Sequence, residues 1–316
     1  MLYSSMRRSK FQIVSRRGLE WLECAPLARQ PWIQHAFSTR SGGASQAPAA
    51  GLNLGFIETD SRVQVEKNRQ QFFHELGAGE SSLAELRQIH SATVYQVVRS
   101  ARDKLDFRPA GYSFSRAGRD GIPQGDALLT QEPGVTLSVR AADCMPVLLV
   151  DPRRRAVAAV HAGWRGALAG IVEITVGEMV RVFGSNPGDL LVAIGPSIRA
   201  CCYQVGEEVV GAFSGRYPKG EDFFLAAPHD RVEEEIARRY PLLFLTKQPP
   251  GHGPDAVPTL HLDLVAVAAD QLTRAGVKPS QIHVADFCTA CRTDIFFSHR
   301  KEGSGTGRMM AIIGIV

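Results

Sequence analysis

The chain has few of the features that mark secreted, membrane or disulfide-rich proteins. Its 316 residues contain no apolar run of about 18 residues, the length that a membrane-spanning helix needs. The first 14 residues hold no apolar core of signal-peptide length. Six cysteines are too few for a disulfide scaffold in a chain of this size. We therefore expect a cytoplasmic protein with reduced thiols and no membrane partner.

An excess of charge of one sign is also missing. The 36 lysines and arginines nearly balance the 32 acidic residues, and beyond the basic segment Met1–Arg17 they are spread along the chain. Because there is no basic stripe, we expect no nucleic-acid partner. With 44% hydrophobic and 22% charged residues, the composition is typical of a globular domain.

Strand and helix patterns alternate along the chain without an internal repeat or a shift in composition, which favours one α+β domain. Apolar periodicity predicts helices over Val63–Leu76, Ala167–Phe183 and Leu262–Arg274. Short β-branched runs predict strands at Leu86–Ile89, Val94–Val98, Leu128–Thr130, Val135–Val139, Pro146–Asp151, Ala156–Val160 and Leu190–Ile194. Residues 107–125 and 217–258 are rich in Gly, Pro and charge, and we interpret them as loops with one helix near Val232–Arg239.

A cysteine and a histidine flank two of these strands. Cys144 precedes Pro146–Asp151 and His161 follows Ala156–Val160, and the short polar turn between the strands lets them run antiparallel. This pairing brings the start of the first strand beside the end of the second. Cys144 and His161 are therefore expected to be neighbours, and their residue types indicate a metal site or a nucleophile.

His90 adds a third possible donor. In "QIHSATV" it lies between two short apolar runs, at a strand edge or a turn. Two histidines and one cysteine form a three-ligand set like that of catalytic zinc sites, which keep a fourth position for water or substrate. The spacing is not that of a compact zinc motif, so a surface or core role for each histidine stays open at this point.

Two aspartates and a glycine-containing turn surround these donors. Asp126 and Asp143 are suited to orient a ligand histidine, although a capping or turn role is equally open for both. In "HAGWRG", residues 161–166, Arg165 lies just before a predicted helix. An arginine beside a helix N-terminus suits an anion such as phosphate, and the alternative is an ordinary strand-to-helix turn. Cys288 and Cys291 form a CxxC that we interpret as structural thiols, because no second CxxC accompanies it.

Eight sequence blocks point to a known family. In chain order they are "HAFSTRSGGAS", "GLNLG", "QIHSATV", "GDALLT", "ADCMPVLLVD", "AVHAGWRG", "AIGPSIRACCYQVGEEV" and "FSHRKEGSGTGRM". Together they closely resemble the laccase-domain or YfiH-type family, the purine nucleoside phosphorylases once called polyphenol oxidases. We expect residues 31–316 to form the catalytic domain of this type. Residues 1–30 are then an N-terminal extension with a possible edge strand near Leu19–Cys24.

The resemblance implies a four-layer α/β/β/α sandwich with mixed sheets and one metal site per chain. It implies that His90, Cys144 and His161 are zinc ligands, and we add Asp143 to these catalytic residues. It also implies phosphorolysis of adenosine, inosine, guanosine and methylthioadenosine, together with deamination of adenosine. We expect purine nucleosides and phosphate as partners of a monomer or small homo-oligomer. Our candidates for contacts to phosphate, ribose or base are Arg40, Ser38, Asn53, Arg165 and Arg300.

Three other functions are considered. The first is a copper polyphenol oxidase, because two histidines, one cysteine and the adjacent Met145 resemble a blue-copper set. Adjacent residues on a strand point to opposite faces, however, so the Met145 side chain is expected to point away from a metal bound by Cys144. The second is an editing factor for peptidoglycan precursors, an activity also linked to the family. The third is a structural zinc, which is disfavoured because such sites have four protein ligands.

Overall fold

The computed structural model describes residues 10–78, 82–111, 121–226 and 260–316. The chain divides into two compact units, Met1–Ile198 with Leu264–Val316, and Arg199–Asp263. The helix predicted near Val232–Arg239 lies outside the described residues. None of the helices in the described ranges combines the length and the apolar character that crossing a membrane requires.

A six-stranded mixed sheet forms one layer of the first unit. Its order is β1-β2-β3-β16-β8-β4, and β4 with β8 is its parallel pair. The N-terminal segment supplies two strands of this sheet, so the strand expected at Leu19–Cys24 is present, but β1 takes the edge position outside it. The strands are β1 (Phe11–Arg16), β2 (Leu19–Cys24), β3 (Ile33–Ser38), β4 (Leu83–Ala84), β8 (Thr136–Ala141) and β16 (Met309–Ile315).

A seven-stranded mixed sheet forms the next layer. Its order is β15-β11-β9-β10-β7-β5-β6, with parallel pairs at β5–β7 and β11–β15. All residues of β9 and β10 are buried, as expected of strands covered on both faces. The strands are β5 (Val94–Arg99), β6 (Leu105–Pro109), β7 (Ala127–Thr130), β9 (Met145–Asp151), β10 (Ala156–Ala162), β11 (Leu191–Ile194) and β15 (Ile282–Val284).

One predicted strand is wrong. Residues 86–89 form no strand, and only Arg87 makes an isolated bridge, to Gln124. The reason is that a side chain replaces the backbone partner there: the Gln88 amide donates to the Arg140 carbonyl (2.7 Å) and accepts from the Arg140 N–H (2.8 Å). The other six predicted strands correspond to β5, β7, β8, β9, β10 and β11.

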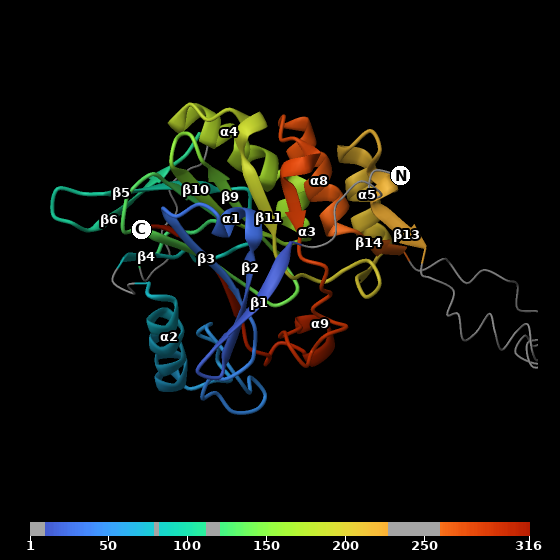
Figure 1. Ribbon diagram of the computed structural model, residues 1–316. Coiled ribbons are helices and arrows are strands. Elements are labelled where there is room, and N and C mark those ends of the chain that lie inside the picture. Colours follow the sequence, from blue (N-terminus) through green and yellow to red (C-terminus); the bar gives the residue numbers. More distant parts are fainter. Residues whose placement is uncertain (1–9, 79–81, 112–120, 227–259) are drawn as a thin grey trace, which may run out of the picture. The chain divides into compact units, whose positions relative to one another are not determined.

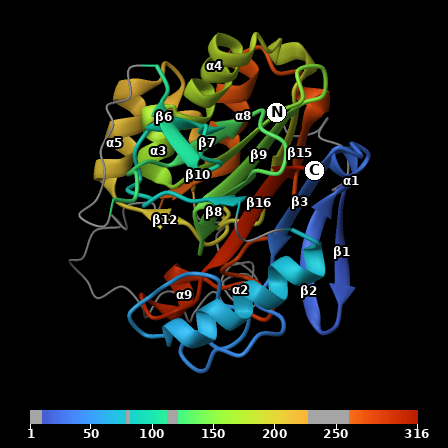
Figure 2. The same cartoon turned by 90° about the vertical axis from the view of Figure 1, so that its left-hand side faces the viewer.

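Helices cover the outer faces of the two sheets. On the six-stranded sheet, Phe72 and Phe73 of α2 (Arg62–Leu76) pack with Trp21 of β2 and Ile312 of β16. On the seven-stranded sheet, α4 (Ile171–Phe183) contacts β5, β7 and β10, and α3 (Trp164–Ala169) and α8 (Leu264–Arg274) contact α4. The inner faces of both sheets share one hydrophobic core. The first unit is thus the predicted α/β/β/α sandwich, with α2 and α4 on opposite sides (Figures 1 and 2).

The helix predicted over Ala167–Phe183 is two helices. Gly170 has a left-handed backbone (φ 85°), ends α3 and begins α4, because glycine adopts this conformation without steric cost. Gly77 ends α2 in the same way. The remaining short helices in the described part of this unit are α1 (Ala25–Ala28), α9 (His299–Glu302) and the 3₁₀ turns η3 (Pro187–Asp189) and η5 (Pro279–Gln281).

The second unit is small and has its own three-stranded sheet, in the order β12-β14-β13. Its aromatic core gathers around Phe213, whose ring contacts those of Tyr217, Phe223 and Phe224. In its described residues, 199–226 and 260–263, the elements are β12 (Gln204–Val205), α5 (Glu207–Arg216), η4 (Gly220–Phe223), β13 (Phe224–Ala226) and β14 (Leu260–Leu262).

Candidate metal centre

The pairing of β9 with β10 brings Cys144 and His161 together, as the turn between the two strands predicts. The strands are antiparallel, with His161 opposite Pro146 and Ala162 opposite Met145. Cys144 directly precedes β9, so its side chain lies at the same end of the sheet as His161. His161 is buried, whereas Cys144 is half-buried.

His90 reaches the same place through a turn that a carboxylate organises. Its backbone is left-handed (φ 58°), which is uncommon for a residue with a side chain. Asp126, just before β7, accepts hydrogen bonds from the backbone N–H groups of Ile89 (3.3 Å), His90 (3.0 Å) and Ser91 (2.6 Å), and from the Ser91 hydroxyl. The Asp126 carboxylate therefore stabilises the conformation that presents His90.

The three donor atoms lie at the spacing of a metal-ligand set. One donor atom from each of His90, Cys144 and His161 lies within 4.8 Å of the others, and His90 Nε2 is 3.6 Å from Cys144 Sγ. Tetrahedral zinc with ordinary bond lengths separates a nitrogen and a sulfur ligand by about 3.6 Å. A Cβ on Gly163 would lie 2.6 Å from His90 Cδ2 and 3.0 Å from Cys144 Sγ, so glycine is needed beside the triad. This donor set fits zinc.

Asp126 also fixes the orientation of His161. His161 Nδ1 donates to Asp126 Oδ1 at 2.9 Å, and the His161 backbone N–H donates to the Asp126 carbonyl at 2.7 Å. A histidine whose Nδ1–H is held by a carboxylate presents Nε2 as the ligand atom. One aspartate thus supports both histidines, His161 through its ring and His90 through its backbone.

The electrostatics of the triad favour the thiolate, which is the metal-binding form of cysteine. Burial opposes ionisation of Cys144, but the charges and hydrogen bonds of His161 and His90 outweigh it and lower the Cys144 pKa. Burial likewise opposes protonation of His161, but Cys144 and Asp126 outweigh it and raise the His161 pKa. In the metal-free protein these interactions favour a thiolate on Cys144 and an imidazolium on His161.

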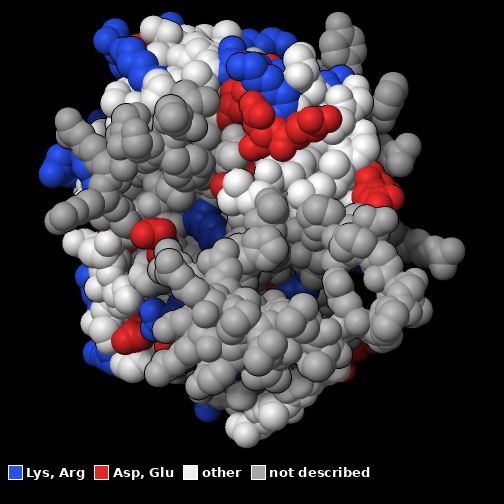
Figure 3. Space-filling view, turned by 90° about the vertical axis from the view of Figure 1, so that its right-hand side faces the viewer, with Lys and Arg blue, Asp and Glu red and all other residues white. Residues whose placement is uncertain are grey.

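The triad opens into a cavity of about 430 Å³. Its walls come from the loop after Asn53, the segment before His90, the end of β8, the helix α9 and the approach to β16. Among the described residues, the lining includes three arginines and no acidic side chain. The outer surface differs from the cavity, because acidic and basic side chains lie side by side on the face shown in Figure 3. The lining residues are Gly55, Phe56, Ile57, Arg87, Gln88, His90, Arg140, Ala141, Ala142, Cys144, His161, His299 and Arg308.

The structure does not bring the predicted phosphate arginines to this cavity. Arg40 donates to Glu302 (2.7 Å), to the Thr293 carbonyl (2.7 Å) and to the Ala50 carbonyl (3.2 Å). Arg165 is exposed, with its guanidinium over the Trp164 ring. A phosphate-binding role for either stays a prediction, but in the structure the charge of Arg40 is paired with a carboxylate.

The other predicted contact residues support the fold around the cavity. Ser38, at the end of β3, is buried and accepts from the Met310 N–H (2.9 Å). The Asn53 side-chain oxygen accepts from the backbone N–H groups of Gly55 (3.0 Å) and Arg308 (2.8 Å), both of which line the cavity. Arg300, exposed on α9, lies outside the lining formed by the described residues.

Asp143, the residue before Cys144, links this part of the chain to α9. It is buried, has a left-handed backbone (φ 87°), and its carboxylate accepts from the Thr289 hydroxyl and from the Arg300 backbone N–H, each at 2.6 Å. Since His299 lines the cavity, this link positions one wall of the cavity. Of the two aspartates, Asp126 and not Asp143 contacts a histidine of the triad.

Sequence reasoning missed Arg87, Arg140 and Arg308, which do line the cavity. Arg87 and Arg308 lie within or next to the blocks "QIHSATV" and "FSHRKEGSGTGRM", but an arginine in a loop usually faces solvent. Arg140 is the last residue but one of β8 and lies two residues before the block "ADCMPVLLVD". Its place beside Arg308 follows from the pairing of β8 with β16, which local patterns do not reveal.

Known proteins resemble the chain over nearly its whole length. It is 33% identical to the purine nucleoside phosphorylase YlmD of Geobacillus stearothermophilus over 308 residues, which cover 96% of this chain and 97% of that protein. It is 31% identical to the adenosine deaminase RL5 of an unknown prokaryotic organism, covering 86% and 90% of the two chains. The crystal structure of the hypothetical protein YfiH from Bacillus licheniformis superimposes with a TM-score of 0.77 at 27% identity, covering 98% and 100%.

The family model described as multi-copper polyphenol oxidoreductase laccase matches residues 34–316. This range includes every residue of the triad and of the cavity lining. The resemblance expected from the eight sequence blocks is thereby confirmed. The chain belongs to the multi-copper polyphenol oxidoreductase laccase family, the group that contains the YfiH and YlmD proteins.

Proposed function

We propose that this protein is a zinc-dependent purine nucleoside phosphorylase that also deaminates adenosine. The observation that carries the proposal is the His90–Cys144–His161 triad in the wall of a cavity of about 430 Å³. The names of relatives that are similar in sequence support it, since they include a purine nucleoside phosphorylase and an adenosine deaminase. The expected substrates are adenosine, inosine, guanosine and methylthioadenosine, with phosphate as the second substrate.

The triad has the donors that zinc prefers. His90, Cys144 and His161 would hold the ion, and zinc held there would supply Lewis acidity and activate water for attack on a purine. Asp126 keeps His161 in the tautomer whose Nε2 is free to act as a ligand. The lowered pKa of Cys144 keeps the thiol deprotonated near neutral pH.

The cavity suits a nucleoside in size and character. Its volume falls within the range of about 300–1,000 Å³ that is usual for small-molecule sites. Phe56 and Ile57 offer apolar surface against which a purine ring can pack, and Phe56 is 43% exposed. Gln88 and His299 also line the cavity and can exchange hydrogen bonds with a base or ribose.

A copper polyphenol oxidase is the second candidate, because the family description names copper. A blue-copper set would need an axial ligand such as Met145. Met145 is fully buried in β9 and is not among the described residues that line the cavity. The position of Met145 therefore favours zinc.

Metal analysis of the purified protein, followed by parallel assays on nucleosides and phenols, separates the two functions. We expect about one zinc per chain, phosphate-dependent release of purine base from inosine, ammonia release from adenosine and no oxidation of phenols. A protein that binds copper, consumes oxygen with phenols and leaves nucleosides intact would overturn the proposal.

A further inference from the structure

Two arginines beside the triad lack a close ion pair in the described part of the chain: Arg140 lies 3.9 Å from Glu85, and no carboxylate lies in ion-pair range of Arg308. Arg140 and Arg308 both line the cavity, and no acidic side chain lines it among the described residues. Met310 pairs with Arg140 across β8 and β16. Arg308, two residues before Met310, is therefore the diagonal neighbour of Arg140 on the same face, about 7–8 Å away between backbones. Long side chains at such positions can reach one ligand.

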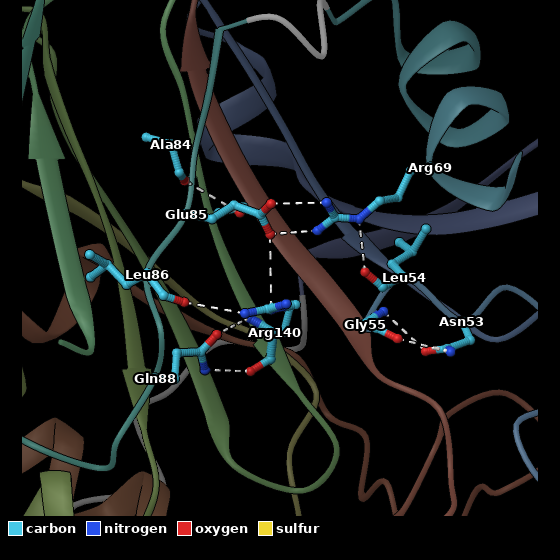
Figure 4. Close-up of polar contacts among 10 residues, drawn as sticks. Asn53, Leu54, Gly55, Arg69, Ala84, Glu85, Leu86, Gln88 and Arg140 are labelled. Carbon is cyan, nitrogen blue, oxygen red and sulfur yellow. Dashed lines mark hydrogen bonds and ion pairs between the residues drawn. The ribbon is translucent and has the colours of Figure 1, made fainter. Parts of the chain in front are cut away.

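Arg140 is held in place. Its guanidinium donates to the Leu86 carbonyl at 3.2 Å, and its Nε lies 3.9 Å from Glu85 Oε1. Gln88 also bonds both the N–H and the carbonyl of Arg140. Figure 4 shows the Arg140 guanidinium beside the Glu85 carboxylate and the Leu86 carbonyl. An arginine fixed in this way loses little conformational freedom on binding a ligand.

Glu85 lies between two positively charged side chains, those of Arg69 and Arg140. Arg69, which is 5% exposed, donates to both Glu85 oxygens and also to the Leu54 carbonyl. Glu85 is therefore already neutralised by Arg69, and Arg140 reaches it only through the longer 3.9 Å contact. One carboxylate between two guanidinium groups leaves a net positive charge. Arg140, which lines the cavity, is the member of this group that can offer that charge to a ligand.

Arg308 adds a second positive charge. Its Nη1 donates to the carbonyls of Thr306 and Gly307, and no carboxylate forms an ion pair with it in the described part of the chain. A Cβ on Gly55 would lie 2.6 Å from the Cβ and Cγ of Arg308, so Gly55 leaves room for this side chain. Carbonyl partners orient the guanidinium of Arg308, and the nearby Cys144 thiolate and Asp143 carboxylate balance part of its charge.

We propose that Arg140 and Arg308 form an oxyanion site that binds inorganic phosphate beside the His90–Cys144–His161 triad. Two guanidinium groups offer paired N–H donors that match a tetrahedral oxyanion. The identity of the anion rests on the proposed phosphorylase function, because phosphate is the second substrate of that reaction. The site differs from the Arg40 and Arg165 positions that the sequence suggests.

Direct binding of phosphate to the zinc-loaded protein tests the site without any turnover. Isothermal titration of inorganic phosphate compares the wild type with Arg140→Ala, Arg308→Ala and the control Arg181→Ala. Arg181 is an exposed arginine of α4 that pairs with Glu178 and is not among the residues lining the cavity. We expect Kd to rise about 10- to 150-fold in each cavity variant, the usual effect of losing a charged hydrogen bond. The control should bind like the wild type.

Folding and zinc content are checked for each variant by thermal unfolding and metal analysis. Arg140→Lys keeps the charge but not the paired donors, and we expect an intermediate Kd. Adenosine 5′-monophosphate, titrated separately, distinguishes a free phosphate ion from the phosphate ester of a nucleotide. Wild-type phosphate affinity in both folded alanine variants, or an arginine-dependent response to the nucleotide alone, would overturn the inference.

The inference and the proposed function can fail separately. If phosphate binds through Arg140 and Arg308 but no nucleoside is cleaved, the oxyanion site stands and the proposed function is wrong. If inosine is cleaved and both variants keep the wild-type KM for phosphate, the function stands and the oxyanion site is wrong.

Discussion

Replacing Asp126 with asparagine tests how much of the metal site depends on one buried carboxylate. Asp126 is fully buried and accepts from His161 Nδ1, from the N–H groups of Ile89, His90 and Ser91, and from the Ser91 hydroxyl. Burial alone would raise the Asp126 pKa, but the hydrogen bonds from His161 and Ser91 and the charge of His161 outweigh it and lower the pKa. The carboxylate therefore stays ionised at neutral pH.

Asparagine can supply only one of the two acceptor oxygens. Its NH₂ group then faces an N–H donor, and a buried donor without an acceptor costs about 1–3 kcal/mol. If the amide oxygen faces the turn, His161 loses its anionic partner. Loss of a partner that orients a ligand histidine typically weakens metal affinity by about 10- to 100-fold, or about 1.4–2.7 kcal/mol. This cost equals that of losing one charged hydrogen bond.

Zinc competition with a chromophoric chelator at constant pH measures the effect. We expect Asp126→Asn to fold and to bind zinc about 10- to 100-fold more weakly than the wild type. Asp143→Asn is the matched control, because the Asp143 carboxylate bonds Thr289 and the Arg300 N–H instead of a triad histidine. The control should keep wild-type zinc affinity. Equal zinc affinity in wild type and Asp126→Asn would refute this reasoning.

Three further predictions follow from single residues. Cys144→Ser should lose zinc and activity together, since serine is a poor zinc ligand at neutral pH, and full zinc occupancy by metal analysis would contradict the assignment. Gly163→Ala should cut zinc occupancy in the same analysis, because its Cβ would lie 2.6 Å from His90 Cδ2; unchanged zinc content would show that His90 can shift. Burial lowers the pKa of His35 to about 4, so the unfolded chain, in which histidine has a pKa of about 6.5, binds more protons below that pH. The free energy of unfolding should therefore fall as pH drops from 6.5 towards 4, with His35 contributing about 2 kcal/mol of the loss at pH 5. Urea unfolding at pH 7.5 and 5 should show a smaller loss in His35→Gln, and an equal loss would exclude His35 as the cause.

Local patterns were sufficient to predict the part of the site that one hairpin builds. Cys144 and His161 flank two adjacent strands, and a short turn between such strands leaves antiparallel pairing as the simplest arrangement. His90 was a third possible donor by residue type, and the family resemblance assigned it to the site, because its position depends on hydrogen bonds to Asp126, which lies 36 residues further along the chain, just before β7. The period of the apolar residues could not reveal this contact.

The arginines show where sequence reasoning stops. Arg40 stood out within a motif, yet its charge is paired with Glu302 from the C-terminal helix α9, a contact that no local pattern signals. Arg140 and Arg308 become neighbours only because β16 returns to pair with β8. The strand predicted at residues 86–89 failed for a similar reason, since the Gln88 side chain takes the place of a strand partner.

Phosphorus NMR of the zinc-loaded protein with inosine and inorganic phosphate shows whether the triad and its cavity catalyse phosphate-dependent cleavage of purine nucleosides. We expect a new resonance from ribose 1-phosphate that grows in equal amount to hypoxanthine and is absent with metal-free protein. Hypoxanthine without a new phosphorus signal, or the same signal from Cys144→Ser protein that holds no zinc, would contradict it.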